Sequence, residues 1–189
     1  MTLSSETRVV AGVELTLLRP ESPESLIDEQ EFERDEFLPY WAELWPAATT
    51  LAEALPDVGG LRVVELGCGL GMASLVAAAK GADVTATDWS TEAIALLREN
   101  AARNGLTLTA RVYDWRDPWD ARFDLAVAAD VLYERRNVEP LLARLTTLAP
   151  EALVALAGRP YEQEFLRRAE ASGQLAEQVG KLVRLREER

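Results

Sequence analysis

Residues 63–71, VVELGCGLG, carry the clearest fold signal of the chain, because an apolar strand runs there directly into three closely spaced glycines. Glycine lets the backbone turn sharply and approach a ligand closely, since it has no Cβ atom. The helix expected over residues 70–80 then points its first amide groups at whatever lies in the turn. A strand, a glycine turn and a helix in this order predict a ligand site at the carboxyl end of a strand in an α/β protein.

Strands and helices alternate on the carboxyl side of this stretch. On its amino side, residues 8–18 predict a short hairpin, and Pro46 begins a helix that runs to about Leu55. Alternating units of this kind favour a mostly parallel sheet with helices on both faces. The strands are expected at residues 61–66, 83–88, 107–114, 123–130 and 152–158, the helices at 70–80, 91–104, 138–148 and 161–171, and a last hairpin within 174–189.

The composition is that of one soluble globular domain. The chain has 189 residues, of which 48% are hydrophobic and 28% charged, and this length suits a single core. Its apolar runs are too short to cross a bilayer, and the first twenty residues do not resemble a secretory signal. Cys68 is the only cysteine, so no internal disulfide is possible. We therefore expect a cytoplasmic protein that does not associate with membranes.

Acidic residues outnumber basic ones by 32 to 20, which gives a net charge of −12. That charge repels phosphate backbones, so nucleic acid is not expected as a partner, whereas a basic protein or a cationic ligand is attracted. Residues 21–36 hold eight of the acids and form either a recruiting surface or a solvated loop. With no histidine and one cysteine, no metal site is expected.

The glycine spacing and a nearby acid indicate which ligand the turn accepts. A dinucleotide site favours GxGxxG, but residue 72 is Met and the spacing is GxGxG. Glu65 precedes the turn and would repel a pyrophosphate, whereas it would attract an ammonium or sulfonium group. This weighs against a nicotinamide-dinucleotide enzyme. The alternative for Glu65 is that it only caps backbone groups of the turn.

Two further strand ends carry groups that suit an adenosine. Asp88 ends the next predicted strand, where a carboxylate can accept both hydroxyls of a ribose. Asp114 and Trp115 end the third, where they can receive an adenine amino group and cover the ring. The alternatives are that Asp88 merely starts a helix and that Trp115 is a core aromatic residue. Together the three strand ends fit an adenosine with a cationic amino-acid arm.

Three further motifs carry a family resemblance over roughly residues 38–166: YWAELWPAA (40–48), DVLY (130–133) and AGRPYEQEF (157–165). With them the chain resembles the class I, seven-β-strand S-adenosylmethionine-dependent methyltransferases. It is most similar to the protein-lysine methyltransferases that include the electron-transfer-flavoprotein β-subunit enzyme. The resemblance implies a Rossmann-like three-layer α/β sandwich, in which a mostly parallel seven-stranded sheet has an antiparallel final strand. Residues 1–189 then form one domain: an N-terminal extension and lid, with a hairpin and a helix, over 1–58, and a core over 59–189.

The same resemblance implies roles for single residues. Trp45 would line the methionine end of S-adenosylmethionine, and Gly67 and Gly69 would hold its amino-acid part. Asp88 would bind the ribose. The full set of expected cofactor-binding residues is Trp45, Glu65, Gly67, Gly69, Asp88, Trp89, Asp114, Trp115 and Ala129. Because the tail after Gly173 is short, the last strand pair is expected to be abbreviated.

Asp130 and Tyr133 are the expected catalytic residues. Asp130 would orient a substrate amine through its lone pairs, and the ring of Tyr133 would line the channel. Alternatively, Asp130 caps the next turn and Tyr133 packs in the core. Tyr40 and Trp41 form either part of a substrate lid or a hydrophobic staple for the following helix. Arg159 contacts either substrate or a nearby acid.

The predicted function is an S-adenosylmethionine-dependent N-methyltransferase that acts on a lysine of a protein and releases S-adenosylhomocysteine. A small-molecule amine, as in nicotinamide methylation, is the alternative substrate. A non-catalytic protein that only binds the cofactor is the alternative from another class. A monomer is favoured.

Overall fold

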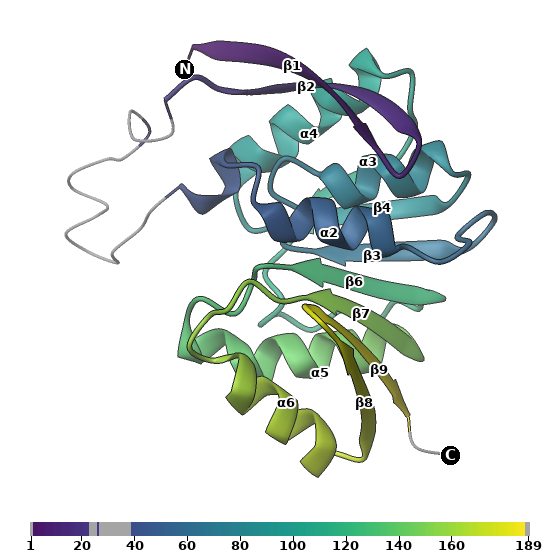
Figure 1. Ribbon diagram of the computed structural model, residues 1–189, viewed down its shortest axis with the longest axis vertical. Coiled ribbons are helices and arrows are strands. Elements are labelled where there is room, and N and C mark those ends of the chain that lie inside the picture. The colour runs from purple at the N-terminus through teal and green to yellow at the C-terminus, as the bar shows by residue number, and fades with distance from the viewer. Residues whose placement is uncertain (1, 23–25, 27–38, 188–189) are drawn as a thin grey trace.

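The computed structural model describes residues 2–22, 26 and 39–187, so most of the acidic segment 21–36 lies outside the described residues. Figure 1 shows a central sheet with helices on both sides and a separate hairpin at one end. The strands are β1 (Leu3–Val10), β2 (Val13–Pro20), β3 (Arg62–Leu66), β4 (Asp83–Asp88), β5 (Thr109–Val112), β6 (Leu125–Ala129), β7 (Glu151–Ala155), β8 (Gln174–Val179) and β9 (Leu182–Glu187). The α-helices are α2 (Pro46–Ala54), α3 (Met72–Ala79), α4 (Thr91–Arg103), α5 (Val138–Leu148) and α6 (Glu162–Ala171).

The main sheet has seven strands in the order β5-β4-β3-β6-β7-β9-β8. Strands β3 to β7 pair in parallel, and β9 is antiparallel to both of its neighbours, β7 and β8. This confirms the predicted Rossmann-like sandwich with its antiparallel final strand. Strand order reverses beside β3, which has β4 on one side and β6 on the other, so the sheet opens a crevice at the end of β3.

The expectation of an abbreviated last strand pair is wrong. Strands β8 and β9 have six residues each, and β9 pairs with every residue of β7. A two-residue connection at Gly180 and Lys181 keeps the tail short, because antiparallel strands need no crossover helix. The short tail therefore still completes the sheet.

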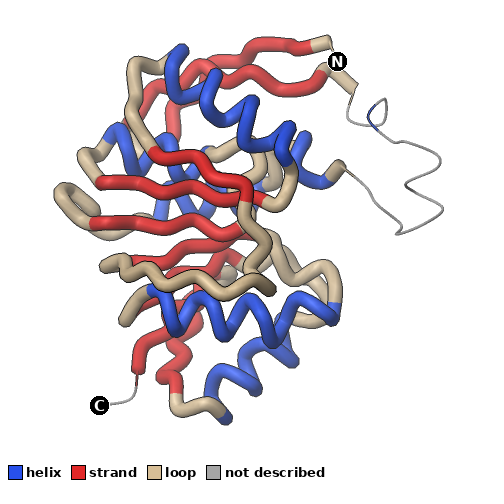
Figure 2. The backbone as a smooth tube through the Cα atoms, turned by 180° about the vertical axis from the view of Figure 1, so that it is seen from behind, coloured by secondary structure: helices blue, strands red, loops and turns tan. Residues whose placement is uncertain are grey.

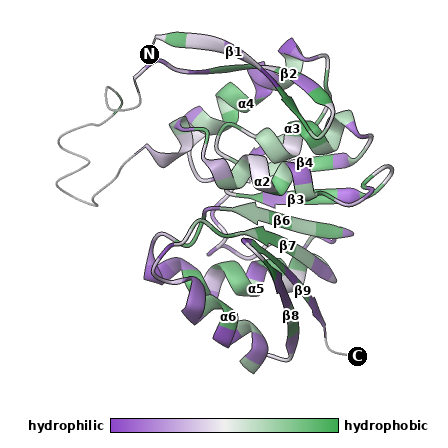
Figure 3. Cartoon of the chain, in the orientation of Figure 1, coloured by the Kyte–Doolittle hydropathy of each residue, from purple (hydrophilic) through white to green (hydrophobic). Residues whose placement is uncertain are grey.

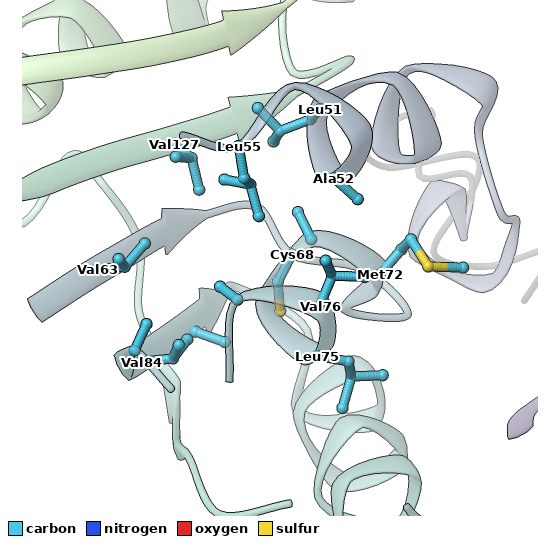
Figure 4. Close-up of a cluster of buried hydrophobic side chains, with 14 of the residues drawn as sticks. Leu51, Ala52, Leu55, Val63, Cys68, Met72, Leu75, Val76, Val84 and Val127 are labelled. Carbon is cyan, nitrogen blue, oxygen red and sulfur yellow. The ribbon is translucent and has the colours of Figure 1, made fainter. Parts of the chain in front are cut away.

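Alternating residues of the strands serve the two faces of the sheet, because successive side chains of a strand point in opposite directions. Val63 and Val127 belong to the cluster that packs under α2, α3 and α4, and Figure 4 shows them with Leu51, Leu55 and other members. Their neighbours Val64 and Ala126 belong to the second cluster, under α5 and α6. Figure 3 shows hydrophobic residues along β6 and hydrophilic ones over much of α6, whose outer side faces solvent.

The hairpin β1–β2 lies at the opposite end of the molecule from β8–β9, as Figures 1 and 2 both show. Its turn places Ala11 and Gly12 at φ 51° and 80°, the left-handed geometry of a two-residue hairpin turn. The side-chain amides of Asn100, in α4, and Asn104, the C-cap of α4, dock it by hydrogen bonds to the backbone of Leu18 and Thr16 of β2 respectively. These amides continue the hydrogen bonding of the edge strand, so the hairpin is fixed to the core.

None of the helices in the described part of the chain is both long and apolar enough to cross a membrane.

Candidate active site

The glycine turn follows β3, and its three glycines all need the left-handed region. Gly67, Gly69 and Gly71 have φ values of 74°, 50° and 81°. A Cβ atom on Gly67 would lie 2.8 Å from the side chain of Val131, and one on Gly71 would overlap Leu97. The turn is therefore held close to the next corner of the sheet and to α4, which only glycine permits.

Glu65, on β3 just before the turn, holds the first turn of α3 in place. Its Oε2 accepts hydrogen bonds from the backbone amide of Ser74, at 2.9 Å, and from the Ser74 hydroxyl. The carboxyl is 1% exposed, and this burial raises its pKa to about 7, against an ordinary value of 4.5. The hydrogen bonds from Ser74 lower this pKa and the charge of Asp88 raises it further, but both effects are smaller than that of burial. Glu65 thus caps backbone groups, as one interpretation of the sequence held, and it also lines the pocket described below.

Asp88 ends β4 and joins the glycine turn to α4. Its Oδ2 accepts a hydrogen bond from the Gly69 amide at 2.9 Å, and its Oδ1 accepts one from the Ser90 amide at 3.0 Å. The Ser90 hydroxyl in turn caps α4, accepting from the Ala93 amide at 3.1 Å. Burial raises the pKa of Asp88. Two buried carboxylates with raised pKa values therefore lie at one turn, which disfavours the anionic form of both until a positive charge arrives.

Asp114 and Trp115 lie in the loop after β5. Asp114 forms an ion pair with Arg116, whose Nε lies 2.9 Å from each carboxylate oxygen. That pair lowers the pKa of Asp114, so this acid stays ionised. Trp115 is 8% exposed and belongs to the core cluster beneath α5, and its ring lies against Gly67. Trp115 is therefore a core aromatic residue that also lines the pocket.

The DVLY corner follows β6 and contains backbone strain. Asp130 has φ 55°, a left-handed conformation that costs a residue with a Cβ atom about 1–2 kcal/mol. Its carboxylate, buried at the corner, forms a two-point ion pair with Arg159, with Nε to Oδ1 at 2.6 Å and Nη2 to Oδ2 at 2.9 Å. The arginine therefore contacts an acid near the strand end, which is one of the two roles that the sequence left open.

Aromatic rings from two segments face the same corner. The rings of Tyr40 and Tyr133 have centroids 4.8 Å apart, and those of Tyr40 and Trp45 are 6.2 Å apart. The indole Nε1 of Trp45 donates a hydrogen bond to the carbonyl oxygen of Tyr40 at 2.7 Å. Burial, and to a smaller degree the charge of Asp88, raises the pKa of the Tyr133 hydroxyl, which stays neutral. Tyr40 thus lies with the candidate catalytic residues at the pocket.

A single pocket joins these features at the carboxyl ends of β3, β4, β5 and β6. Around it, the structure brings together all the residues that the sequence predicted for cofactor binding or catalysis. They are Trp45, Glu65, Gly67, Gly69, Asp88, Trp89, Asp114, Trp115, Ala129, Asp130 and Tyr133. Their individual roles stay predictions.

The pocket also has lining residues that sequence reasoning missed. Arg116, Glu134, Arg136 and Asn137 line it together with the predicted set. They directly follow the two predicted corners in the sequence, which is the signal that could have found them. Among the described residues, no group of three histidine, cysteine, aspartate or glutamate side chains is placed to hold a metal ion. The site is suited to bind a cation beside its buried acids and an apolar or aromatic group beside its rings.

Comparison with known proteins finds relatives among lysine methyltransferases. The chain is 33% identical over 135 residues to the protein-lysine methyltransferase METTL21E of Bos taurus, covering 62% of this chain and 46% of that protein. It is 31% identical over 138 residues to the electron transfer flavoprotein beta subunit lysine methyltransferase of Danio rerio, covering 67% and 52%. The chain thus spans about half the length of these relatives.

A solved structure shows the same fold. The 16S rRNA N2 G1207 methyltransferase of T. thermophilus, in complex with AdoMet and guanosine, matches with a TM-score of 0.69 and 21% identity. The match covers 100% of this chain and 51% of the other. Residues 39–172, which include the pocket, match the family described as lysine methyltransferase, which confirms the resemblance inferred from the motifs. The chain belongs to the lysine methyltransferase family.

Proposed function

We propose that this protein transfers a methyl group from S-adenosylmethionine to the amino group of a lysine side chain in a protein. The observation that carries the proposal is the single pocket in which two buried acids at a glycine turn lie with an aromatic corner. Membership of the lysine methyltransferase family and the names of the relatives support the same reaction.

The residues of the pocket fit S-adenosylmethionine. Burial raises the pKa values of Glu65 and Asp88, so a positively charged ligand beside them would restore their ionised forms. The sulfonium and ammonium groups of this cofactor supply that charge, whereas a pyrophosphate would oppose it. Asp88 would accept the ribose hydroxyls, because each carboxylate oxygen has a second lone pair beyond its bond to an amide. Asp114 and Trp115 would hold the adenine end.

When bound, the cofactor supplies a methyl group on a positively charged sulfur and leaves as S-adenosylhomocysteine. The chain's own residues align the acceptor amine and favour its neutral form, so its proton is lost to solvent before it enters. The rings of Tyr40, Trp45 and Tyr133 exclude water and disfavour the ammonium form of an entering lysine, so the amine enters with its lone pair available. Asp130 uses one lone pair of each oxygen for Arg159, and the remaining lone pairs orient the amine.

The charge of the chain supports a protein substrate over RNA. A net charge of −12 attracts a basic protein surface and repels a phosphate backbone. The matched structure is that of an rRNA methyltransferase, so the same fold also occurs in an enzyme that modifies RNA. The experiment must therefore distinguish a protein substrate from an RNA substrate. A cytoplasmic location and a monomeric state stay predictions.

The test incubates the purified protein with methyl-labelled S-adenosylmethionine and a cell lysate in three forms: untreated, digested with ribonuclease, and acetylated to block lysine amines. We expect label on protein in the untreated and digested lysates and its loss in the acetylated one. The variant Asp88→Ala, weakened in cofactor binding, is the control for labelling by other enzymes. Label only on RNA or only on a small molecule would reject the protein substrate.

A further inference from the structure

The segment 157–162 is held in an unusual way beside the candidate active site. One oxygen of Glu162, Oε1, accepts three backbone amide hydrogens, from Ala157 at 2.7 Å, Gly158 at 2.8 Å and Arg159 at 2.9 Å. Glu162 is buried at the start of α6, and its charge-assisted bonds fix the loop that leaves β7. The carboxylate therefore sets where the side chain of Arg159 begins.

Arg159 contacts two other segments from that fixed position. Its guanidinium forms the two-point ion pair with Asp130 of the DVLY corner. The same group lies 5.2 Å from the ring centroid of Trp45, within range of a cation–π contact. Three segments distant in the sequence thus meet at one guanidinium.

An ion pair of this kind contributes little to the stability of the fold, because desolvation of the charges offsets their attraction. The side chain of Asp130 is 4% exposed and that of Arg159 29%, so both charges lose most of their hydration. Buried pairs often stabilise a fold no better than apolar residues of similar size, so their presence favours a role in positioning. The left-handed φ of Asp130 is a second strained feature at the same point, and strain of this kind gathers at functional sites.

We propose that Arg159 is a positioning residue for methyl transfer: held by Glu162, its guanidinium fixes the Asp130 carboxylate and the Trp45 ring so that they face an acceptor amine. The inference rests on the proposed methyltransferase function but not on the identity of the acceptor. Lysine cannot replace this arginine fully, because an ammonium lacks the planar fork that grips both carboxylate oxygens.

The first test needs no substrate. The five tryptophans are replaced by 5-fluorotryptophan, and the ¹⁹F resonance of Trp45 is assigned with Trp45→Phe. We expect Arg159→Gln to move that resonance and to leave the resonance of Trp119 in place. Trp119 is an internal control, because its ring lies under a different guanidinium, that of Arg111, at 4.5 Å. A Trp45 resonance unmoved in Arg159→Gln would overturn the proposed coupling.

The second test measures catalysis with labelled S-adenosylmethionine and whichever class of acceptor the wild type labels. Arg159→Gln should lower the transfer rate at saturating cofactor about 100-fold, the loss expected when a reacting group is misplaced by about 1 Å. Its dissociation constant for S-adenosylhomocysteine should stay within about threefold of wild type, because the acids of the turn remain. Arg159→Lys should recover part of the rate. The exposed Arg167→Gln, on the same helix as Glu162, is the matched control and should behave as wild type.

Wild-type transfer in Arg159→Gln would overturn the proposal, and so would equal losses of transfer and of S-adenosylhomocysteine affinity in a folded variant. If Arg159→Gln fails to fold, Arg159→Lys and Glu162→Gln decide in its place: each must lower transfer without weakening S-adenosylhomocysteine binding. If the wild type labels a small molecule instead of protein, the proposal of a protein substrate is rejected. Both tests of Arg159 can then still be carried out with that small molecule as the acceptor.

Discussion

Glu65→Gln tests how the buried acid at the glycine turn responds to charge. The pKa of Glu65 is raised to about 7 from an ordinary 4.5, because burial disfavours the anion. Folding therefore favours the protonated acid: this contribution is fully present below pH 4.5 and is lost as pH rises through 7. A shift of this size corresponds to about 3 kcal/mol. The wild type should thus lose thermal stability between pH 5 and pH 8, and Glu65→Gln should lose less.

A cationic ligand should reverse the preference of the folded protein for the protonated form of Glu65. If the positive charge of S-adenosylmethionine returns the pKa of Glu65 to its ordinary value, the ligand must deprotonate the acid in order to bind at low pH. The dissociation constant should then be about tenfold higher at pH 6 than at pH 8. Glutamine keeps an oxygen for the Ser74 amide but cannot ionise, so Glu65→Gln should lack this pH dependence.

Isothermal titration calorimetry at both pH values measures the effect. The amino group of the ligand titrates in the same way with both proteins, so the ratio of wild-type to variant dissociation constants isolates Glu65. Adenosine, which carries no positive charge, is the second control and should show no such change. A tenfold pH dependence that persists in Glu65→Gln, or one that adenosine shares, would refute the reasoning.

Five further substitutions test three separate parts of the structure. Asp88→Ala should weaken S-adenosylmethionine binding about 10- to 100-fold by calorimetry, whereas Asp130→Ala should lower turnover more than affinity; identical behaviour would show that the division of roles is wrong. Gly71→Ala should lower the free energy of unfolding in urea by about 2–4 kcal/mol, since its φ is 81° and its Cβ would overlap a leucine of α4. Gly105→Ala, at φ 64° in open space, should lose only about 1 kcal/mol. Asn100→Ala removes two hydrogen bonds from α4 to β2 and should lose about 2–4 kcal/mol in the same assay.

The sequence predicted the order and type of the elements well, because buried strands and capped helices leave local signals. The strand predicted at 83–88 is β4, and Ser90 caps α4 as expected. The strand predicted at 107–114 is shorter, Thr109–Val112. It ends there because its partner β4 ends at Asp88, opposite Val112, and a strand continues only where it is paired. The residue pattern of 107–114 alone does not show where the pairing with β4 ends.

The pocket could be predicted because parallel strands end at one edge, so residues after successive strands meet. The connections across the pocket could not be predicted. Asp130 and Arg159 are 29 residues apart, and no periodicity indicates which loop meets which. The burial of Trp115 could not be predicted either, because its ring lies against Gly67 and belongs to a core cluster built from other segments. Pairwise contacts between loops depend on packing, which a single sequence does not display.

A crystal structure with S-adenosylhomocysteine would show directly whether the ligand lies across the strand ends. We expect the ribose on Asp88, the adenine beside Asp114 and Trp115, and the sulfur facing Tyr133. An empty pocket at saturating ligand, or a ligand bound away from the ends of β3, β4 and β5, would contradict this expectation.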